Sequence, residues 1–461
     1  MRVCNQDLLG SLHHAAAAIL VVSLGGCVMP DTAGQREVSG SERSASGWSI
    51  PFWGTTSGPV LAGGLLYAGS GDGAIYALHP GSGAVSWKFQ TGEGLSTGPA
   101  VFPAQGGQGR RAVWATPVVE NGTVLVGSRD FSFYAIDAAI GRKKWSFKTG
   151  GEIFDTAIIH GSNVIFTSAD GFLYAVDVGT GDKKWALEPL PEMQKRLPSE
   201  PIVEHGVVYV TNWPASAESY LYAIDAVSGV VKWVVRTKGG FPSPPRHIDG
   251  QIYFSTRKTS PGIVTLHAVD ASSGEVKWRF DAVAHLPDSD PVIAVRDMVI
   301  LGTDRGVFAL QAKTGVLRWS RVVKSSEMFG PVYADDGLLY LTSQTLDGSV
   351  HALDPTTGEV KWSSSPGTGG LPFGIADRVV RKIAAVRGDT IYATGYGYLY
   401  SLQRETGQVL WSFRVTNGIH ARPLIADGMV FISGAALLYH LNKPTLGYFY
   451  AVDAATGKLR P

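Results

Sequence analysis

The sequence predicts an all-β protein folded as a single closed β-propeller of four-stranded blades, eight or nine in number, and two observations carry this prediction. One motif recurs nine times: two strand-like apolar runs, then Ala-x-Asp, a Thr-Gly or Ser-Gly turn, and a Trp four residues after that Gly. The tryptophans recur every 40 to 58 residues, a period that is typical of propeller blades rather than of helical repeats.

The N-terminal residues 1–26 are expected to be a lipoprotein signal peptide. The apolar run over residues 15–24 has the length of a signal-peptide core and is too short to span a bilayer. Residues 24–27, Leu-Gly-Gly-Cys, resemble the bacterial lipobox, in which the cysteine is acylated before cleavage. We therefore expect lipidated Cys27 to hold the mature chain on a membrane surface. The alternative is a buried strand or an uncleaved anchor, which Asp7 in the leading region favours.

Residues 27–47 are expected to be the lipidated cysteine followed by a flexible tether, because they are rich in Ser, Gly and charged side chains without apolar periodicity. No Asp follows Cys27 directly, and by resemblance to enteric lipoproteins such an Asp retains a protein at the inner membrane. The expected location is the bacterial cell envelope, at the outer membrane facing the periplasm in a cell that has one. Cys4, the only other cysteine, would leave with the signal, so no disulfide is expected.

The residues of the repeat are interpreted as structural. The Asp accepts hydrogen bonds from its own turn, the Gly adopts a positive φ, and the Trp supplies a flat ring for the seam between blades. An acid used at six corresponding corners is not expected to be catalytic. The residues are Trp87, Trp145, Trp185, Trp233, Trp278, Trp319, Trp362 and Trp411, with Asp137, Asp177, Asp225, Asp270, Asp354 and Asp453; His79, Gln311 and Gln403 replace the Asp in the other copies.

The ninth copy reaches Asp453 and Gly457, but the sequence stops at Pro461, where its Trp should stand. Residues 48–50, Trp-Ser-Ile, read like the Trp-Ser-Phe of residues 145–147. We therefore expect this N-terminal strand to pair in the last blade and close the ring, because an open propeller would leave unpaired strand edges.

The composition excludes one class of partner. The net charge is +1, from 40 basic and 39 acidic residues, so no excess positive field is available to hold a nucleic acid. A hydrophobic content of 44%, with 57 Gly and 25 Pro, fits a folded, turn-rich β protein.

The pattern Ala-x-Asp-x-x-Thr-Gly-x-x-x-Trp resembles the repeat of the quinoprotein, or pyrroloquinoline-quinone-like (PQQ-like), β-propellers, over nearly all of residues 48–461. That family includes quinone-dependent alcohol dehydrogenases and non-enzymatic BamB-like outer-membrane assembly lipoproteins, to which this chain is closest in character. Family propellers usually have eight blades. Nine copies imply either one irregular insertion or a larger ring.

The chemistry that the resemblance implies for dehydrogenases is not found in these residues. Such enzymes carry adjacent cysteines above the quinone and often a Cys-x-x-Cys-His haem site, and the mature chain has no thiol beyond Cys27. No catalytic residue and no metal site are predicted, no cofactor is expected, and cofactor-binding residues stay unknown. Gly-x-Ser-x-Gly at residues 94–98 is interpreted as an inter-blade loop, and the Gly-rich residues 69–73 as a hairpin turn.

Three departures from the repeat are the expected carriers of partner specificity: residues 93–114, 187–198 and 365–382. The second mixes apolar and basic side chains with prolines, which suits a protein interface. It is also loosely similar to the inter-blade loop by which BamB-like propellers contact their partner; a loop folded over the propeller face is the alternative. Its candidate interface residues are Leu190, Met193, Arg196 and Leu197. The basic cluster of the third is interpreted as solvated rather than lipid-bound.

The sequence thus favours a lipid-anchored, non-catalytic scaffold at the bacterial envelope, whose partner is an envelope protein such as a component of β-barrel assembly. The alternative is a propeller that binds PQQ or another small ligand in its channel, as a quinone-dependent dehydrogenase or a sensor.

Overall fold

The computed structural model describes residues 48–53, 57–92, 112–188, 199–212, 218–240, 242–258, 262–284, 292–322, 333–335, 337–343, 348–366, 380–395, 397–415, 418–419, 421–434 and 446–459. Residues 45–461 form one compact unit. Its described residues contain strands and turns but no helix, and therefore no helix that could cross a membrane.

Nine four-stranded antiparallel sheets, the blades, make up this unit. The first three blades are β2 (Val60–Ala62), β3 (Leu65–Gly69), β4 (Ala74–Leu78) and β5 (Val85–Gln90); β6 (Val118–Glu120), β7 (Thr123–Gly127), β8 (Ser132–Asp137) and β9 (Lys143–Lys148); and β10 (Ile158–His160), β11 (Asn163–Thr167), β12 (Leu173–Asp177) and β13 (Lys183–Leu187). The next three are β14 (Ile202–Glu204), β15 (Val207–Asn212), β16 (Glu218–Asp225) and β17 (Val231–Lys238); β18 (Arg246–Ile248), β19 (Gln251–Lys258), β20 (Ile263–Asp270) and β21 (Val276–Val283); and β22 (Val292–Val295), β23 (Met298–Thr303), β24 (Gly306–Gln311) and β25 (Leu317–Val322). The last three are β26 (Tyr333–Ala334), β27 (Leu339–Thr342), β28 (Val350–Leu353) and β29 (Val360–Ser364); β30 (Val380–Arg387), β31 (Thr390–Gly395), β32 (Tyr398–Gln403) and β33 (Val409–Arg414); and β34 (Leu424–Ala426), β35 (Met429–Gly434) and β36 (Leu446–Asp453), completed by β1 (Ser49–Trp53).

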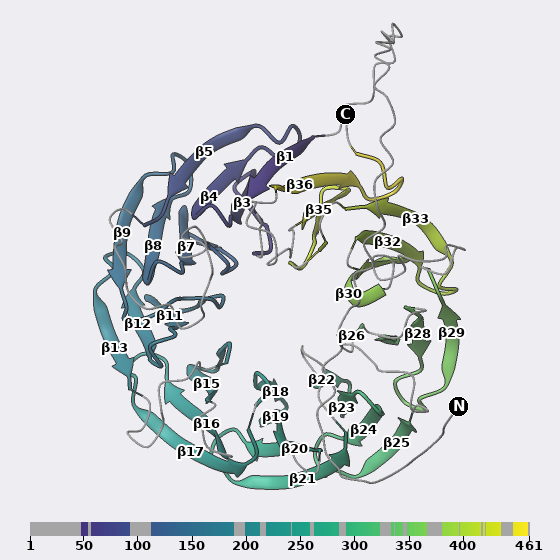
Figure 1. Cartoon of the computed structure of the whole chain (residues 1–461). Coiled ribbons are helices and arrows are strands. Elements are labelled where there is room, and N and C mark those ends of the chain that lie inside the picture. Colours follow the sequence, from purple (N-terminus) through teal and green to yellow (C-terminus); the bar gives the residue numbers. More distant parts are fainter. Residues whose placement is uncertain are drawn as a thin grey trace, which may run out of the picture. The chain divides into compact units, whose positions relative to one another are not determined.

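The predicted closure of the ring is confirmed. Strand β1 pairs antiparallel with β36, Ser49 opposite Tyr450, and supplies the outermost strand of the ninth blade. Figure 1 shows the blades arranged as a ring in which β1 and β36 lie beside the first blade. The predicted propeller class is therefore confirmed, and the number of blades is nine.

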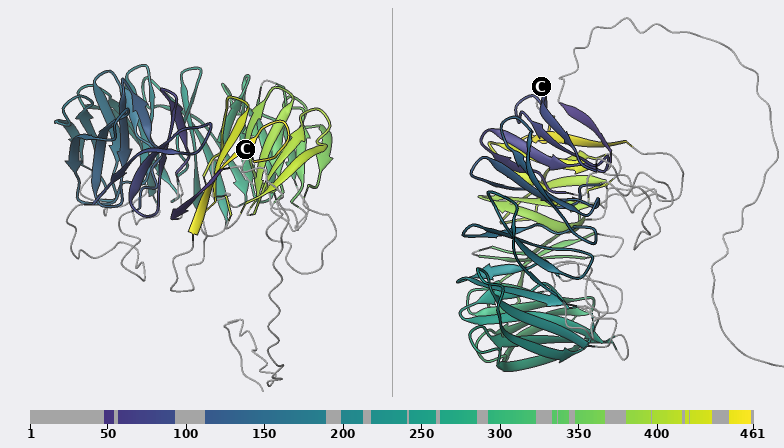
Figure 2. Two further views of the ribbon diagram at one scale, coloured as in Figure 1. Left: turned by 90° about the horizontal axis from the view of Figure 1, so that it is seen from above. Right: turned by 90° about the vertical axis from the view of Figure 1, so that its left-hand side faces the viewer.

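The core is divided among the seams between blades. Nine buried apolar clusters lie one at each seam, counted over the described residues, and the ninth-to-first seam has its own cluster around Phe431 and Phe449. Since each strand alternates its side chains between two faces, every blade contributes to two clusters. The blades therefore stabilise one another. Figure 2 shows them standing side by side around the ring.

Antiparallel strand order gives the ring two different faces. The turns between first and second strands and between third and fourth strands lie on one face, which we call the turn face. The turns between second and third strands, and the connections from one blade to the next, lie on the other, which we call the loop face. Each departure from the repeat, at residues 93–114, 187–198 and 365–382, connects two blades, so the strands around it lead to the loop face.

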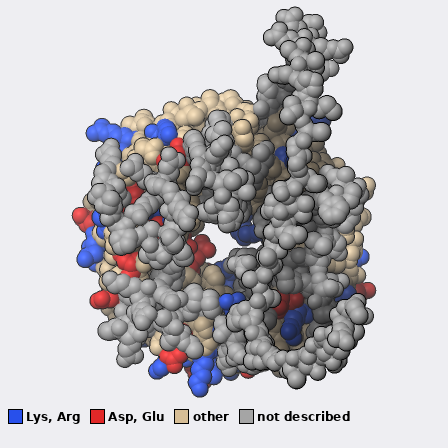
Figure 3. Space-filling view, in the orientation of Figure 1, with Lys and Arg blue, Asp and Glu red and all other residues tan. Residues whose placement is uncertain are grey.

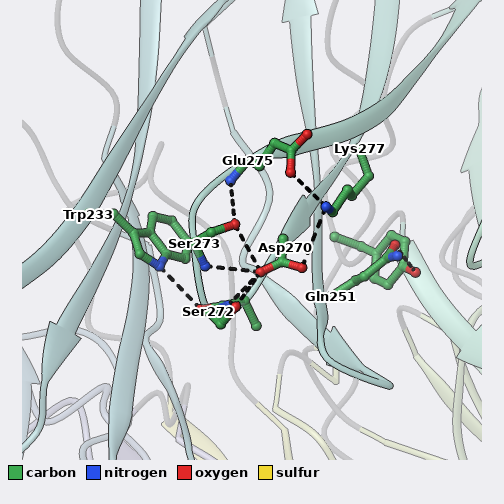
Figure 4. Close-up of polar contacts among 9 residues, drawn as sticks. Trp233, Gln251, Asp270, Ser272, Ser273, Glu275 and Lys277 are labelled. Atoms are coloured by element: carbon green, nitrogen blue, oxygen red, sulfur yellow. Dashed lines mark hydrogen bonds and ion pairs between the residues drawn. The ribbon is translucent and has the colours of Figure 1, made fainter.

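The repeat Trp lies flat against the repeat Gly of the following blade. Trp233 shows the arrangement: a Cβ on Gly274, whose φ is +76°, would meet its ring at 2.8 Å. The indole Nε1 of Trp233 also donates to the carbonyl oxygen of Ala271 at 3.2 Å (Figure 4). The same Nε1 bond is present at eight seams. Close packing and one buried hydrogen bond therefore fix neighbouring blades together.

The turn that carries this Gly is held by the repeat Asp. Asp270 Oδ1 accepts from the backbone N–H groups of Ser272 and Ser273, both at 3.0 Å, and from both hydroxyls (Figure 4). These bonds, the Ser272 hydroxyl first, lower the pKa of Asp270 to about 2. Because the folded pKa lies below the unfolded value, this turn stabilises the fold above about pH 4 and loses that contribution as the pH falls toward 2.

The closing seam lacks one interaction that the others have. Trp48 packs against Gly83 and stacks on Phe449, with ring centroids 6.0 Å apart. Its Nε1 is nevertheless buried without a hydrogen-bond partner among the described residues. His79 stands where most repeats have Asp, and Pro80 follows it. The strand that closes the ring is therefore held by pairing and packing without the indole hydrogen bond.

The substitution Gly274→Ala tests the packing of Gly on Trp. Gly250→Ala, in the same blade, is its matched control, because Gly250 has a φ of +78° but nothing within 4 Å of an added Cβ. Both variants suffer backbone strain, and Gly274→Ala must also displace the Trp233 ring. We expect it to destabilise by about 1–3 kcal/mol more than the control in urea denaturation. Equal midpoints for the two variants would contradict the packing role.

Trp→Phe substitutions test the closing seam. Trp87→Phe removes the bond from Nε1 to the Ala138 carbonyl, which measures 2.9 Å, whereas Trp48→Phe removes a donor that has no partner. We expect Trp87→Phe to lower the free energy of unfolding by about 1 kcal/mol more than Trp48→Phe. An equal or larger loss for Trp48→Phe, measured by thermal denaturation, would show that its indole nitrogen is bonded.

Candidate functional site

The repeat residues occupy seams and turns. Each of the six repeat aspartates accepts two backbone N–H groups of its own turn through Oδ1. Lys184 and Lys232 form ion pairs of 3.1 and 3.3 Å with the second oxygens of Asp177 and Asp225. These carboxylates are thus engaged on the turn face, separated by whole blades. The arrangement brings no two of them together as an acid and base pair.

The predicted interface residues Leu190, Met193, Arg196 and Leu197 lie outside the described residues, as does the predicted lipidation site Cys27. The Gly-x-Ser-x-Gly segment at residues 94–98 also lies outside them. The Gly-rich residues 69–73 do form the turn between β3 and β4, with Ser70 N–H donating to the Ala74 carbonyl at 2.9 Å.

A buried ionic and aromatic cluster lies on the loop face of the first three blades. Arg129, in the turn between β7 and β8, donates from Nε to Glu152 Oε1 at 3.0 Å and forms an ion pair with it at 2.8 Å. The guanidinium lies 4.1 Å from the ring centroid of Trp114 and 5.7 Å from that of Phe154. We call these four residues the Arg129 cluster. Its two charged side chains are 6% and 5% exposed.

The Arg129 cluster joins two successive connections between blades. Trp114 lies in the connection before β6, while Glu152 and Phe154 lie in the connection before β10. Backbone bonds extend the link, because Arg129 N–H donates to the Ala112 carbonyl at 3.1 Å and Ala169 N–H donates to that of Glu152 at 2.7 Å. One Arg side chain therefore ties together the entries to the second and third blades.

Sequence reasoning missed this cluster, although a signal was present. The same turn reads Ser70-Gly-Asp in the first blade and Ser168-Ala-Asp in the third, so the Arg at position 129 departs from the repeat. A small residue suffices for the turn, and the Arg is therefore an addition. Glu152 Oε2 is buried and has no hydrogen-bond partner among the described residues, which marks the cluster as costly to maintain.

Asp155 follows the cluster in the same connection. Its Oδ2 accepts from the Thr167 hydroxyl at 2.9 Å, and burial raises its pKa. At the corresponding position Ser57 and Ser199 accept a backbone N–H from the second strand of the blade, at 2.8 and 3.2 Å. Asp155 thus replaces a neutral hydroxyl with an acid that is easier to protonate than a normal carboxyl.

Three histidines gather on adjacent blades at the turn face. His205 and His247 have ring centroids 5.8 Å apart, and His160 lies within 4 Å of a Cβ built on Gly206. Within the described ranges, no three His, Cys, Asp or Glu side chains stand close enough to hold a metal ion. The nearness of these histidines across seams was not visible in the sequence, where they are about 45 residues apart.

Opposite charges are interspersed around the ring. In Figure 3 Lys and Arg stand beside Asp and Glu on the described surface, in agreement with the net charge of +1. No single-sign field dominates the visible described surface. Recognition must therefore depend on local groups.

Comparison with known proteins identifies the relatives of this chain. A family described as outer membrane protein assembly factor BamB matches residues 33–215, 191–344 and 346–460. The outer membrane protein assembly factor BamB of Yersinia pestis is 28% identical over 170 residues, which cover 34% of this chain and 40% of that protein. The dehydrogenase subunit of the quinone alcohol dehydrogenase of Gluconobacter oxydans is 30% identical over 140 residues, covering 27% and 17%. The matches thus span less than half the length of either relative.

Solved structures show the same fold. BamB from Moraxella catarrhalis aligns with a TM-score of 0.51 at 17% identity, over 76% of this chain and 93% of that one. The quinohemoprotein alcohol dehydrogenase from Comamonas testosteroni aligns with a TM-score of 0.52 at 17% identity, over 74% of each chain. At such identities the likeness concerns the fold alone.

Substitutions of Arg129 test the energetic role of the cluster. Arg129→Met leaves Glu152 as an unpaired buried charge, which we expect to cost about 3–5 kcal/mol in chemical denaturation. The double variant Arg129→Met, Glu152→Met removes both charges and should recover most of that loss. A single variant as stable as the double variant would contradict the pairing.

Proposed function

Because this chain belongs to the family of outer membrane protein assembly factor BamB, whose members are PQQ-like β-propellers, we propose that it is a lipid-anchored, non-catalytic scaffold for protein–protein contacts at the bacterial cell envelope. One observation carries the proposal: the repeat residues are engaged in seams and turns, while the departures from the repeat belong to the loop face. The loop face is therefore the proposed interaction surface.

The scaffold acts by holding connections between blades in fixed positions. The Arg129 cluster supports this role, because it anchors two successive connections through a buried ion pair and two aromatic rings. A surface ordered before binding loses less conformational entropy when a partner docks. The Arg129 cluster thus orders the entries to the second and third blades, and the segment that follows β13 leaves the third of these blades.

The proposed contact residues are Leu190, Met193, Arg196 and Leu197, in that connection. Arg is among the residue types that contribute most to binding at protein interfaces, and Met is enriched in them. The proposed partner is an envelope protein, of the kind that the name of the family implies: a component of outer-membrane protein assembly.

The proposed anchor is a lipid on Cys27, followed by a tether over residues 28–47. An acyl chain on this cysteine places the propeller at a membrane surface, and the tether lets the ring orient its loop face toward a partner. The outer membrane facing the periplasm is the proposed location.

The quinone dehydrogenase relatives provide the second candidate, a propeller that binds PQQ. The described residues do not fit a metal-assisted quinone site, because no three His, Cys, Asp or Glu side chains among them converge. The two cysteines of the sequence, Cys4 and Cys27, are not adjacent. We therefore derive no step through a quinone.

Affinity purification from cross-linked envelope fractions tests the scaffold proposal. We expect the unmodified chain to recover an envelope protein, and the double variant Leu190→Asp, Arg196→Glu to recover roughly tenfold less of it, because an apolar anchor and a charge are reversed together. Ile140→Asp is the control, since Ile140 is 66% exposed in a turn of the turn face.

Three outcomes count against the proposal. Equal recovery of the partner by both variants would contradict the loop face as the interaction surface. Retention of the Cys27→Ser variant at the membrane would contradict the lipid anchor. Saturable absorbance with PQQ and Ca²⁺, together with dye-linked alcohol oxidation, would favour the dehydrogenase candidate.

A further inference from the structure

A groove of about 500 Å³ lies between the first and second blades at the outer wall, the surface formed by the outermost strands. This volume is in the range of small-molecule and peptide sites. The first blade contributes the end of β5, and the second contributes β8 and β9 with the turn before them. The lining residues are Phe89, Gln90, Gly92, Asp130, Ser132, Tyr134, Lys143, Ser146 and Lys148.

A small side chain, Ser146 on β9, lines the groove. Ser146 is exposed and pairs across the sheet with Tyr134, whose ring meets Phe89 edge-on at 5.4 Å. Asp130 at the floor is 1% exposed, and its carboxylate accepts from Tyr134 Oη at 2.6 Å and from Ser132 N–H at 2.9 Å. The floor is thus satisfied internally, and the open groups belong to the rim.

Two ammonium groups stand along the rim. Lys143 is exposed and has no hydrogen-bond or ion-pair partner among the described residues, and the same holds for the hydroxyl of Ser146. Lys144 differs, because it donates to Thr123 Oγ1 at 2.8 Å. Lys148 Nζ donates to the Asp130 carbonyl at 2.6 Å and keeps two further N–H groups. The Lys148 ammonium group also lies 5.4 Å from the centroid of the Phe131 ring, so Lys143 is the rim cation that the described residues leave unengaged.

We propose that this groove binds a short extended peptide segment in which two carboxylates, four residues apart, flank an apolar side chain. Lys143 and Lys148 are five residues apart on β9, or about 16 Å along the strand, and alternate side chains of an extended peptide span about 13 Å from the first to the fifth residue. Flexible Lys side chains cover the difference. The third side chain of the peptide then lies between them, facing the Phe89 ring, while Ser146 bonds to the peptide backbone.

This site does not depend on the proposed scaffold function, since it lies on the outer wall and uses none of the loop-face contact residues. A negative result in the partner-recovery experiment can therefore be distinguished from a negative result in the peptide-binding experiment. Loss of the envelope partner through Leu190 and Arg196 leaves the groove unchanged, and loss of peptide binding leaves the loop face unchanged.

Fluorescence anisotropy with a labelled peptide tests the proposal. The probe is fluorescein-Gly-Glu-Thr-Leu-Thr-Glu-Gly, titrated with the whole chain at low salt. We expect saturable binding that weakens roughly tenfold in Lys143→Glu and in Ser146→Glu, because each places a carboxylate beside those of the peptide. Peptides with Lys for Glu, or Asn for Leu, should bind roughly tenfold more weakly than the probe.

Lys183→Glu is the matched control. Lys183 is the first residue of β13, as Lys143 is the first residue of β9, and both are exposed. Lys183→Glu changes the charge as Lys143→Glu does, but Lys183 does not line the groove. We expect its affinity to stay within about twofold of the unmodified chain, with melting temperatures of all three variants unchanged. Three outcomes overturn the proposal: an equal effect of Lys183→Glu, equal binding of the Lys peptide, or no saturation up to about 1 mM.

Discussion

The contact between a tryptophan ring and a glycine of the next blade is the constraint on which the rest of this structure depends. The ring can lie flat only because the glycine has no Cβ, and the glycine takes its positive φ because an aspartate, or a residue in its place, shapes the turn. Repeating this contact at nine seams gives each pair of blades nearly the same relation. The closed ring follows from one local geometry used again and again.

Much of this fold could be predicted from the sequence, because residues that recur at a fixed period mark the positions that each blade requires. Nine copies of the motif predicted the blades, and the residues around Trp48 predicted the closing strand. The sequence marks Arg129 as a departure from the repeat, but it does not indicate its partner: the ion pair joins the turn before β8 to a connection 23 residues later, and the two share no motif. The outer groove was not predicted for a similar reason. Phe89 and Ser146 line it from two different blades, and the strand pattern within one blade does not indicate which residues of the next blade lie beside it.

Symmetry also separates structure from recognition in this molecule. The polar groups that recur from blade to blade form hydrogen bonds within turns and seams, so few of them are left to bind a ligand. The exceptions are local: Arg129 on the loop face departs from the repeat, whereas Lys143 at the outer wall has a counterpart in Lys183 of the next blade. Both side chains stand outside the apolar clusters of the two seams that flank the second blade.

The pairing of β1 with β36 has a consequence for the way the molecule matures. Ser49 pairs with Tyr450, which lies near the other end of the sequence. Closing a loop of this length costs conformational entropy, and such long-range pairing is slow to form. During vectorial synthesis or translocation, the first strand to emerge must wait, without its partner, until the last has arrived. A chain that stopped short of β36 would keep an open sheet edge, which proteases and chaperones can recognise, so this edge stays exposed until β36 has been made and has paired with β1.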